Sequence, residues 1–320
     1  SGNSFSGAER VLFSFLKNVQ EFEFGFLLLQ YNKDIVEYIQ KHFHGKEIII
    51  FNVPLKINRV VRFFTASIYA NIYKRKILGS FIWNKLTNFE PDILYLNNSI
   101  ETAFFPFEKL KIPVISHIHD MVSMFRPSFR NLLLQKLKHA TKILTVSKAS
   151  KKDLEKFGIP SQKIVVVYNN VPQDIINLND ENNSIIKKDF RQTNSKIVIG
   201  FIGGLIKRKG FDILLKSACI ISKKTNLDLV IKIAYHEVDE KYMSFCKKIL
   251  KFCNNIKVEF FKSLPREKIK DFYNEVDIIV VPSRRDPLPT TVLESIALNK
   301  ITIATNVDGI PEIIPDSTFL

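Results

Sequence analysis

The sequence has few cysteines, and no two of them stand at the spacing that redox or zinc-binding motifs use. Three occur in 320 residues, Cys219, Cys246 and Cys253, and each falls in a segment with a helical pattern. An odd, sparse count without a Cys-x-x-Cys pair argues against a disulfide scaffold and against a zinc site. We therefore expect a reducing compartment and no metal.

Long apolar runs are also missing. The longest ones have the length of strands, so the sequence predicts no transmembrane helix, and its start shows no signal peptide. We expect a cytoplasmic protein on this basis. With 46% hydrophobic residues in 320, the chain is large enough for two domains with their own cores.

Strand-like runs alternate with helical patterns along the whole chain, which predicts parallel sheets flanked by helices. The runs lie at 23–29, 47–53, 92–97, 112–118, 142–147, 163–168, 197–202, 227–234, 257–261, 277–281 and 300–304. A stretch rich in Asn, Asp and Lys with little apolar content, 171–195, is the predicted linker. It separates a first domain, 1–170, from a second domain, 196–320.

The most specific motif lies at 281–312, where Asp286 and Glu294 are separated by seven residues. An apolar run before the motif and a helical pattern after it predict a strand, a tight turn and a helix. Pro289 suits the first helical position, because its missing N–H has no partner there. The amides that follow, of Thr290, Thr291 and Val292, are then free to donate to a phosphate or sugar oxygen. Glu294 reaches ribose or sugar hydroxyls.

A second motif, at 197–215, joins an apolar strand to two glycines, a basic loop and an amphipathic helix. Glycines let the backbone approach a ligand closely. Cations beside them suit a pyrophosphate and stabilise the charge that develops on a leaving diphosphate. The residues of this loop are Gly203, Gly204, Lys207, Arg208, Lys209 and Gly210. A basic surface turn is the alternative interpretation.

The first half of the chain supplies two further motifs. A glycine- and serine-rich segment at 1–12, which includes Gly7, opens a helical pattern of Val11, Leu12, Phe15 and Leu16. Further on, the strand-like run 112–118 leads to His119 and Asp120, and ligands of parallel sheets bind beyond the carboxyl ends of strands. We assign His119 to a binding site and His117 to the structure, although a structural role is common for any single histidine.

Taken together, these motifs resemble retaining glycosyltransferases of the GT-B fold, in particular glycosyltransferase family four. The resemblance spans nearly the whole chain and is most specific at 197–215 and 281–312. Three positions depart from the family's pattern: Asp286 stands where Glu is usual, Leu288-Pro289 replaces Phe-Gly, and Gly204 stands where an Arg is expected. Lys207 or Arg208 then supplies the missing phosphate contact, or the contact is lost.

The resemblance implies two Rossmann-like domains whose parallel sheets face a central cleft, with the donor held mainly by the second domain. It implies a nucleotide-diphosphate sugar as donor, a saccharide or lipid-linked acceptor, retention of anomeric configuration, and neither metal nor cofactor. The residues it assigns to catalysis are His119, Lys209 and Asp286. Those it assigns to the donor are Gly7, Gly203, Gly204, Lys207, Arg208, Lys209, Leu288, Pro289, Thr290, Thr291 and Glu294. The sugar, the base and the acceptor stay open.

Charge points to a further partner. The formal net charge is +15, and no acid occurs at 48–89, where seven basic residues alternate with aromatic ones. Cations among aromatics suit an anionic membrane surface, so Arg59, Arg62, Lys74 and Arg75 form a predicted membrane or acceptor patch. A solvated basic helix is the alternative, and nucleic acid is the competing partner. The patch predicts a peripheral place on the inner face of the cell membrane.

Two alternatives to the enzyme remain: a glycosyltransferase-like subunit that binds without catalysis, and a basic nucleic-acid-binding protein. The second explains the charge but neither glycine-rich loop. By comparison with the family we also expect a fragment, without its first strand and its last elements.

Overall fold

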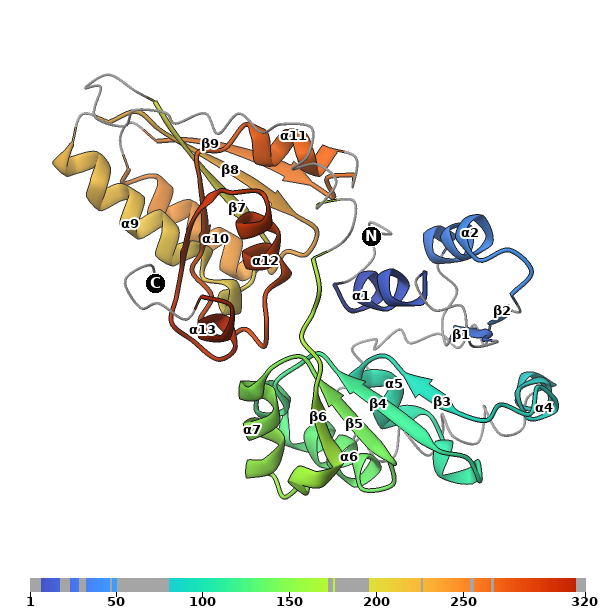
Figure 1. The fold of residues 1–320 in the computed structure, drawn as a ribbon. Coiled ribbons are helices and arrows are strands. Elements are labelled where there is room, and N and C mark those ends of the chain that lie inside the picture. Colours follow the sequence, from blue (N-terminus) through green and yellow to red (C-terminus); the bar gives the residue numbers. More distant parts are fainter. Residues whose placement is uncertain are drawn as a thin grey trace. The chain divides into compact units, whose positions relative to one another are not determined.

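The computed structural model describes residues 7–17, 24–28, 33–46, 48–50, 81–171, 175, 196–225, 227–253, 256–265 and 268–314. The chain divides into two compact units between Tyr168 and Asn169 (Figure 1). Every strand pair among the described residues is parallel, as the alternating pattern predicts. Arg59, Arg62, Lys74, Arg75 and almost all of the predicted linker lie outside the described residues.

The first unit holds a four-stranded sheet in the order β3-β4-β5-β6 and a separate pair, β1-β2. The strands are β1 (Phe26–Leu28), β2 (Ile48–Ile50), β3 (Leu94–Leu96), β4 (Val114–Ile118), β5 (Lys142–Thr145) and β6 (Ile164–Val166). The helices are α1 (Gly7–Leu16), α2 (Lys33–His42), α4 (Phe81–Asn88), α5 (Ser99–Phe104), α6 (Pro127–Leu137) and α7 (Lys148–Lys156).

Local chemistry explains where several of these helices begin. Asn98 caps α5 by accepting a hydrogen bond from the Glu101 amide, and Ser147 caps α7 by accepting one from the Ser150 amide. Strand β4 is buried along nearly its whole length, as expected for a parallel strand that is covered on both faces. Its carboxyl end leads directly to His119.

The second unit holds a five-stranded sheet in the order β11-β10-β7-β8-β9. The strands are β7 (Ile197–Ile202), β8 (Leu229–Tyr235), β9 (Ile256–Lys262), β10 (Ile278–Val281) and β11 (Ile301–Ala304). The helices are α9 (Phe211–Lys224), α10 (Glu240–Leu250), α11 (Ile269–Asn274), α12 (Thr290–Ala297) and α13 (Ile310–Ile313). A 3-10 turn, Lys207–Lys209, precedes α9.

Two hydrophobic cores cover opposite faces of this sheet. Along β8, Ile231 and Ile233 pack with α9 and α10, whereas Ala234 belongs to the core that contains residues of α11, α12 and α13. Side chains of successive residues in a strand point to opposite faces, so each core takes alternate residues. The sheet is therefore the middle layer of a three-layer α/β unit.

Gly210 fixes the contact between the loop after β7 and the loop after β10. Its φ of 74° lies in the left-handed region, and a Cβ built on it would stand 1.8 Å from the Pro282 carbonyl oxygen. Beside it, the Arg284 amide donates to the Arg208 carbonyl oxygen at 2.8 Å. Only glycine fits at this position, because both the backbone conformation and the space exclude a side chain.

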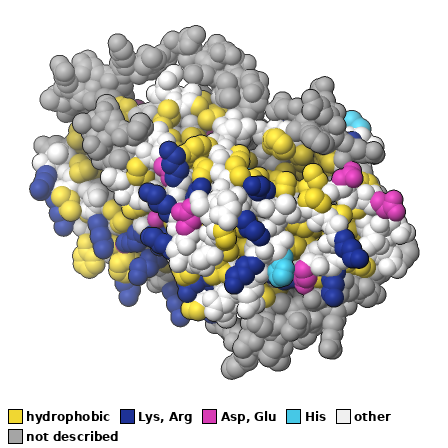
Figure 2. Space-filling model, turned by 60° about the horizontal axis from the view of Figure 1, so that its bottom comes forward, with side chains coloured by type: hydrophobic (Ala, Val, Ile, Leu, Met, Phe, Trp, Pro, Cys, Tyr) yellow, Lys and Arg dark blue, Asp and Glu magenta, His cyan; other side chains and the backbone are white. Residues whose placement is uncertain are grey.

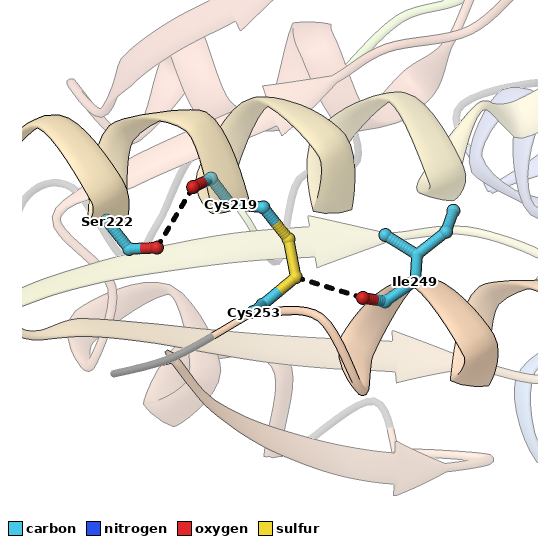
Figure 3. The surroundings of a disulfide bond; sticks show 4 residues. All are labelled: Cys219, Ser222, Ile249 and Cys253. Carbon is cyan, nitrogen blue, oxygen red and sulfur yellow. Dashed lines mark hydrogen bonds between the residues drawn. A yellow bond between two sulfur atoms is a disulfide. The ribbon is translucent and has the colours of Figure 1, made fainter.

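The cysteines differ from the expectation drawn from their number and spacing. Cys219 of α9 forms a disulfide with Cys253, which lies beyond the end of α10, and their Cα atoms are 5.0 Å apart (Figure 3). That separation is ordinary for a bridge. The count and spacing of the cysteines, which argue against a disulfide scaffold, do not indicate this single bridge, and the helical placement of Cys253 is wrong. Cys246 is free and buried.

The described surface reflects the excess of positive charge. In one view, lysine and arginine side chains lie among exposed hydrophobic ones (Figure 2). Among the described residues, no helix combines the length and the apolar character needed to cross a bilayer.

Replacing Gly210 with Ala should lower the free energy of unfolding of the second unit by about 2–4 kcal/mol, because a methyl group cannot fit against Pro282. Gly158→Ala is the matched control, since Gly158 also has a positive φ but nothing lies within 4 Å of its missing Cβ. Chemical denaturation followed by circular dichroism measures both. Fluorescence of Trp83, the only tryptophan, reports the first unit and should not change in Gly210→Ala. Equal losses in the two variants would contradict the steric argument.

Candidate active site

The strand order of the second unit defines where a ligand should bind. The chain runs from β7 outward to β8 and β9, then crosses to β10 and β11 on the other side. The order therefore reverses between β7 and β10, and open parallel sheets bind ligands beyond the carboxyl ends of the strands at such a point. The loops after these two strands are the glycine-rich basic loop and the segment that contains Asp286. The two motifs meet here.

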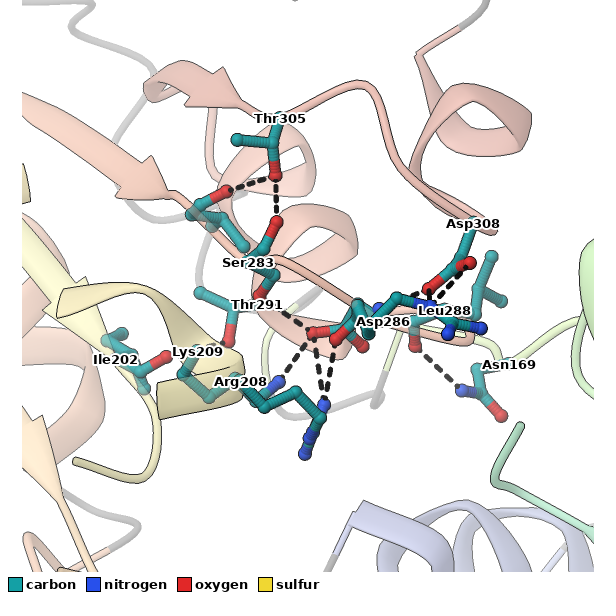
Figure 4. A network of polar contacts seen from close by, with 12 residues as sticks. Asn169, Ile202, Arg208, Lys209, Ser283, Asp286, Leu288, Thr291, Thr305 and Asp308 are labelled. Carbon is teal, nitrogen blue, oxygen red and sulfur yellow. Dashed lines mark hydrogen bonds and ion pairs between the residues drawn. The ribbon is translucent and has the colours of Figure 1, made fainter. Parts of the chain in front are cut away.

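Lys209 and Asp286 form the central contact between the loops. The Lys209 Nζ atom lies 2.6 Å from the Asp286 Oδ2 atom, and the Ser283 hydroxyl donates to the same oxygen at 3.0 Å (Figure 4). The guanidinium of Arg208 is 3.8 Å from it. Asp286 is buried, whereas the lysine side chain is one-fifth exposed. The Asp286 carboxylate thus holds two cations at the carboxyl ends of β7 and β10.

Neighbouring charges support this arrangement. The Asp308 carboxylate accepts from the Arg285 Nε atom and, at 2.9 Å, from the Asp286 amide. Arg208 donates to the Arg285 carbonyl oxygen at 3.1 Å. Arg285 has Asp308 as a carboxylate partner. Among the described residues, Asp286 forms ion pairs with Arg208 and Lys209, and these two cations carry one charge more than the carboxylate.

Asp212, at the start of α9, anchors the opposite side of the β10 loop. Both of its oxygens accept from Arg284, at 2.7 and 2.8 Å, and the Tyr242 hydroxyl donates at 2.6 Å. The hydrogen bonds from Arg284 lower the pKa of Asp212 to about 2, against the effect of burial. The ion pair therefore stays formed over the physiological pH range and fixes the end of β10 to α9.

Helix α12 begins one residue later than its sequence indicates. Pro289 is the residue before the helix, with φ −70° and ψ 120°, and Thr290 is its first residue. The Val292 amide bonds to the Pro289 carbonyl oxygen at 3.1 Å, so the expectation that this amide is free is wrong. Nearby, Leu288 is buried and its carbonyl oxygen accepts from Asn169 at 3.3 Å. Thr291 donates to the Ile202 carbonyl oxygen at the end of β7.

Glu294 lies one turn into α12, and its side chain is buried. The hydroxyl of Tyr273, from α11, donates to the Glu294 Oε2 atom at 3.0 Å. Tyr273 is fully buried, so its hydrogen bond holds the Glu294 carboxylate in one orientation.

Gly204 is buried between the end of β7 and the loop after β8. A Cβ at this position would stand 3.1 Å from a carboxylate oxygen of Glu237. The position that the family resemblance assigns to an arginine therefore faces an acid here. Of the three cations in the loop, Lys207 is exposed, and Arg208 and Lys209 are the two that approach Asp286.

His119 follows β4 in the first unit. Its Nε2 atom lies 3.3 Å from the Asn97 Oδ1 atom at the end of β3, and its ring stacks on His117 with centroids 4.0 Å apart. Burial, with a smaller contribution from His117, lowers the pKa of His119 to about 3. The ring is therefore neutral near pH 7. His117 bonds to the Tyr95 hydroxyl at 2.6 Å, in line with a structural role.

Near the carboxyl end of β3, Glu101 is a partly buried residue that the sequence motifs do not indicate. It lies in the first turn of α5 and accepts from the Asn97 amide at 3.1 Å. Burial, with a smaller contribution from the charge of Glu9 and against the hydrogen bonds from Asn97 and Asn98, raises its pKa to about 7. Asp120 accepts from Ser99 at 3.0 Å, so the ends of β3 and β4 carry a cluster of polar side chains.

The structure thus brings Arg208, Lys209, Asp286 and the start of α12 together in the second unit, and places His119 and Gly7 in the first. Sequence reasoning missed Asp212, Arg284, Asp308 and Tyr273, which hold the site residues from behind. The available signal was the pair of arginines directly before Asp286, Arg284 and Arg285. The partners of these arginines lie far away in the sequence. Among the described residues, no group of three or more His, Cys, Asp or Glu side chains is placed to hold a metal ion.

A parallel α/β fold with a basic loop at the switch point of its second sheet defines a class of proteins suited to phosphorylated ligands. Comparison with family models specifies the class. The model of Glycosyltransferase Family 4 matches residues 6–174, more than half of the chain, and the model of Glycosyl transferases group 1 matches residues 182–318. The chain belongs to glycosyltransferase family 4, as its motifs predict.

Relatives of known sequence agree with this assignment. An uncharacterized glycosyltransferase of Methanocaldococcus jannaschii is 27% identical over 175 residues, which cover 54% of this chain and 44% of the relative. The capsular polysaccharide biosynthesis glycosyltransferase CapM of Staphylococcus aureus is 26% identical over 61% of this chain and 48% of its own length. The chain therefore matches less than half the length of these two relatives.

Solved structures share the fold. HepE of Anabaena, crystallised with UDP and glucose, has a TM-score of 0.67 at 16% identity, covering 98% of this chain and 80% of HepE. The lipopolysaccharide outer core galactosyltransferase WaaB, in its apo form, has a TM-score of 0.60 at 15% identity, with the same coverage of both chains. These likenesses, with the two family models, confirm the predicted GT-B fold class.

Replacing Glu101 with Gln should stabilise the first unit above neutral pH but not in acid. The folded-state pKa of Glu101, about 7, lies above its ordinary value of 4.5, so folding becomes less favourable as the pH rises between these values. At about pH 8 the variant should be more stable by up to about 3 kcal/mol, and near pH 4 the difference should vanish. Trp83 fluorescence during denaturation measures it. A gain that is the same at both pH values would show that the buried charge is not the cause.

Proposed function

We propose that this chain transfers a sugar from a nucleotide-diphosphate donor to a saccharide or lipid-linked acceptor, with retention of anomeric configuration. Membership of the family supports the reaction class. The crystallisation of HepE with UDP and glucose supports a nucleotide sugar as donor, and the role of CapM in capsular polysaccharide synthesis supports a cell-surface glycan as product. The pathway that we propose is the synthesis of cell-surface polysaccharide or glycolipid.

One observation carries the proposal: Asp286 holds Lys209, with Arg208 beside it, at the switch point of the second sheet. A lone exposed lysine loses much rotamer entropy when it binds an anion, whereas one already held by a carboxylate loses less. The pair keeps a net positive charge. It is therefore preorganised for an anionic group that lies beyond the end of β7.

The reaction breaks the bond between the anomeric carbon and the diphosphate oxygen, and it forms a bond from that carbon to an acceptor hydroxyl oxygen. The bonding electrons stay on the diphosphate, and the proton of the acceptor hydroxyl passes to an oxygen of that leaving diphosphate. Lys209 and Arg208 stabilise that developing charge, which is the largest electrostatic demand of the step. This charge stabilisation needs no metal, so the proposal includes neither metal nor cofactor.

The remaining contacts follow from position. The start of α12, at Thr290 and Thr291, offers amides to sugar or phosphate oxygens. Glu294, oriented by Tyr273, accepts from ribose hydroxyls. In the first unit, His119 is neutral because of its burial, so it offers a sugar hydroxyl a hydrogen bond and not a positive charge.

A screen of nucleotide sugars by thermal shift tests the proposal, because a ligand that binds the folded state raises the melting temperature by mass action. The donor that binds is then incubated with acceptors, and nucleotide release and the anomeric configuration of the product are measured. A donor-dependent release with retained configuration supports the reaction. No shift with any nucleotide sugar would overturn it.

A binding subunit without activity is the second candidate. The observation in its favour is Gly204, which leaves the loop without the expected arginine and faces Glu237 instead. A donor that binds tightly but releases no nucleotide with any acceptor would favour this candidate over the enzyme.

Replacing Lys209 with Ala should lower turnover by roughly 30- to 1000-fold, since one charge-assisted contact in the transition state is worth about 2–4 kcal/mol. Lys207→Ala is the matched control, because Lys207 belongs to the same turn but is exposed. It should change turnover by no more than about threefold. The measurement is steady-state nucleotide release. Turnover of Lys209→Ala equal to that of the control would refute the role of Lys209.

Replacing Glu294 with Ala should weaken nucleotide binding, because two ribose hydroxyls lose a charged acceptor, at about 1.5–3 kcal/mol per bond. Tyr273→Phe, which removes only the hydroxyl that orients the carboxylate, should weaken binding less. Calorimetric titration with the nucleotide measures both. If Glu294→Ala binds the nucleotide as tightly as the unchanged protein, the ribose contact is wrong.

A further inference from the structure

Helices α9 and α10 pack against each other on one face of the second sheet (Figure 1). Each helix buries an apolar stripe, represented by Leu215 and Ala218 in α9 and by Met243 and Cys246 in α10. The opposite sides of both helices carry exposed residues. The proposed function uses the start of α9 and leaves this outer surface unexplained.

The charge of the outer surface is mostly positive. Residues 213–225 and 241–253 contain seven lysines, no arginine and no acid. All seven are exposed: Lys216, Lys223, Lys224, Lys241, Lys247, Lys248 and Lys251. The acids of the two helices stand only in their first turns, Asp212 in α9, 4.0 Å from Lys216, and Glu240 in α10. The lysines of an ordinary solvated helix pair alternate with acids, so this surface is unusual in its excess of positive charge.

Large apolar side chains stand among these lysines. Ile220 is 55% exposed, Phe245 is 46% exposed and Phe252 is 75% exposed. In α9, Lys216, Ile220 and Lys224 follow each other at intervals of four residues and share one face. In α10 and the turn after it, Phe245, Lys248 and Phe252 follow each other at intervals of three and four residues.

Two contacts join the stripes of the two helices into one surface. The Nζ atom of Lys216 lies 5.6 Å from the centroid of the Phe245 ring. The second contact is the disulfide between Cys219 and Cys253, whose Cα atoms are 5.0 Å apart. Cys219 precedes Ile220 and Cys253 follows Phe252, so the bridge ties together the segments that carry these two apolar residues. We name this surface the α9–α10 face and define it by Lys216, Ile220, Lys224, Phe245, Lys248 and Phe252.

We propose that the α9–α10 face docks on an anionic lipid surface. Lysine stems extend along apolar surface while their ammonium groups reach the headgroups, so cations and apolar side chains act together at such an interface. Anionic headgroups attract clustered lysines, and the phenylalanine and isoleucine side chains enter the boundary of the acyl chains.

Composition separates lipid from the other partners. Protein interfaces are depleted in lysine and enriched in arginine, and nucleic-acid sites favour arginine for bidentate contacts. The two segments that build this face contain seven lysines and no arginine. The face belongs to the second unit, so it is separate from the predicted patch at 48–89. It would place the donor-binding unit itself against the membrane.

Co-sedimentation of the full chain with lipid vesicles tests the proposal. The full chain should sediment with vesicles that contain phosphatidylglycerol, should not sediment with pure phosphatidylcholine, and should be released by about 0.5 M salt. Replacing Lys216, Lys224 and Lys248 together with Gln should weaken vesicle binding about tenfold or more. Phe252→Ser should weaken it as well, including at low salt, because the apolar contribution is not screened.

The matched control replaces Lys138, Lys152 and Lys156 with Gln. These three lysines are exposed on the first unit, so their replacement removes the same amount of charge from a different surface. Vesicle binding of the control should stay within about twofold of the unchanged protein. An equal loss in the control, no loss in the triple variant, or tighter binding to DNA than to vesicles at the same salt would overturn the proposal. Nucleotide-sugar binding, measured separately, should be unchanged in every variant, so failure of the docking surface is distinguishable from failure of the proposed function.

Discussion

The contact between the loops after β7 and β10 is the constraint on which the second unit depends. Gly210 lets the two backbones touch at Pro282, and the ion pair between Lys209 and Asp286 closes the same contact through side chains. Neither part works alone. A side chain at position 210 would push the loops apart and remove Lys209 from its carboxylate, whereas loss of the carboxylate would leave two cations close together. Packing and electrostatics at the carboxyl ends of β7 and β10 therefore specify one geometry for the two loops.

Such an arrangement also explains why Asp286 is held so firmly. Its side chain accepts from Lys209 and Ser283, and its amide donates to Asp308. A carboxylate with this many partners has one orientation, so the cations that it holds have fixed positions before any ligand arrives. Preorganised charge does not have to reorganise during the reaction, which is why it is effective in catalysis. Asp212 and Arg284 extend the same principle outward, since they fix the β10 loop to α9.

Much of this architecture is predictable from the sequence, because the strands are continuous apolar runs. The run at 197–202 coincides with β7, and the run at 277–281 begins one residue before β10. Glycine and proline mark the turns. What the sequence does not predict are partners that meet only through tertiary packing: Arg284 with Asp212, 72 residues apart, and Cys219 with Cys253. The start of α12 was misplaced by one residue, because Pro289 is compatible with either the position before a helix or its first residue.

The same packing that builds the site leaves the outer surface of α9 and α10 free for another role. A helix beside a parallel sheet buries one stripe and exposes the rest, and the exposed part is not constrained by the fold. Helix α9 begins at Phe211, directly after the basic loop, and ends at Lys224 on the lysine-rich surface. The basic loop and the proposed lipid-docking face are thus joined by one rigid element. An enzyme that uses a lipid-linked acceptor gains from such an element. A helix that rests on the membrane fixes the orientation of the site next to its first turn.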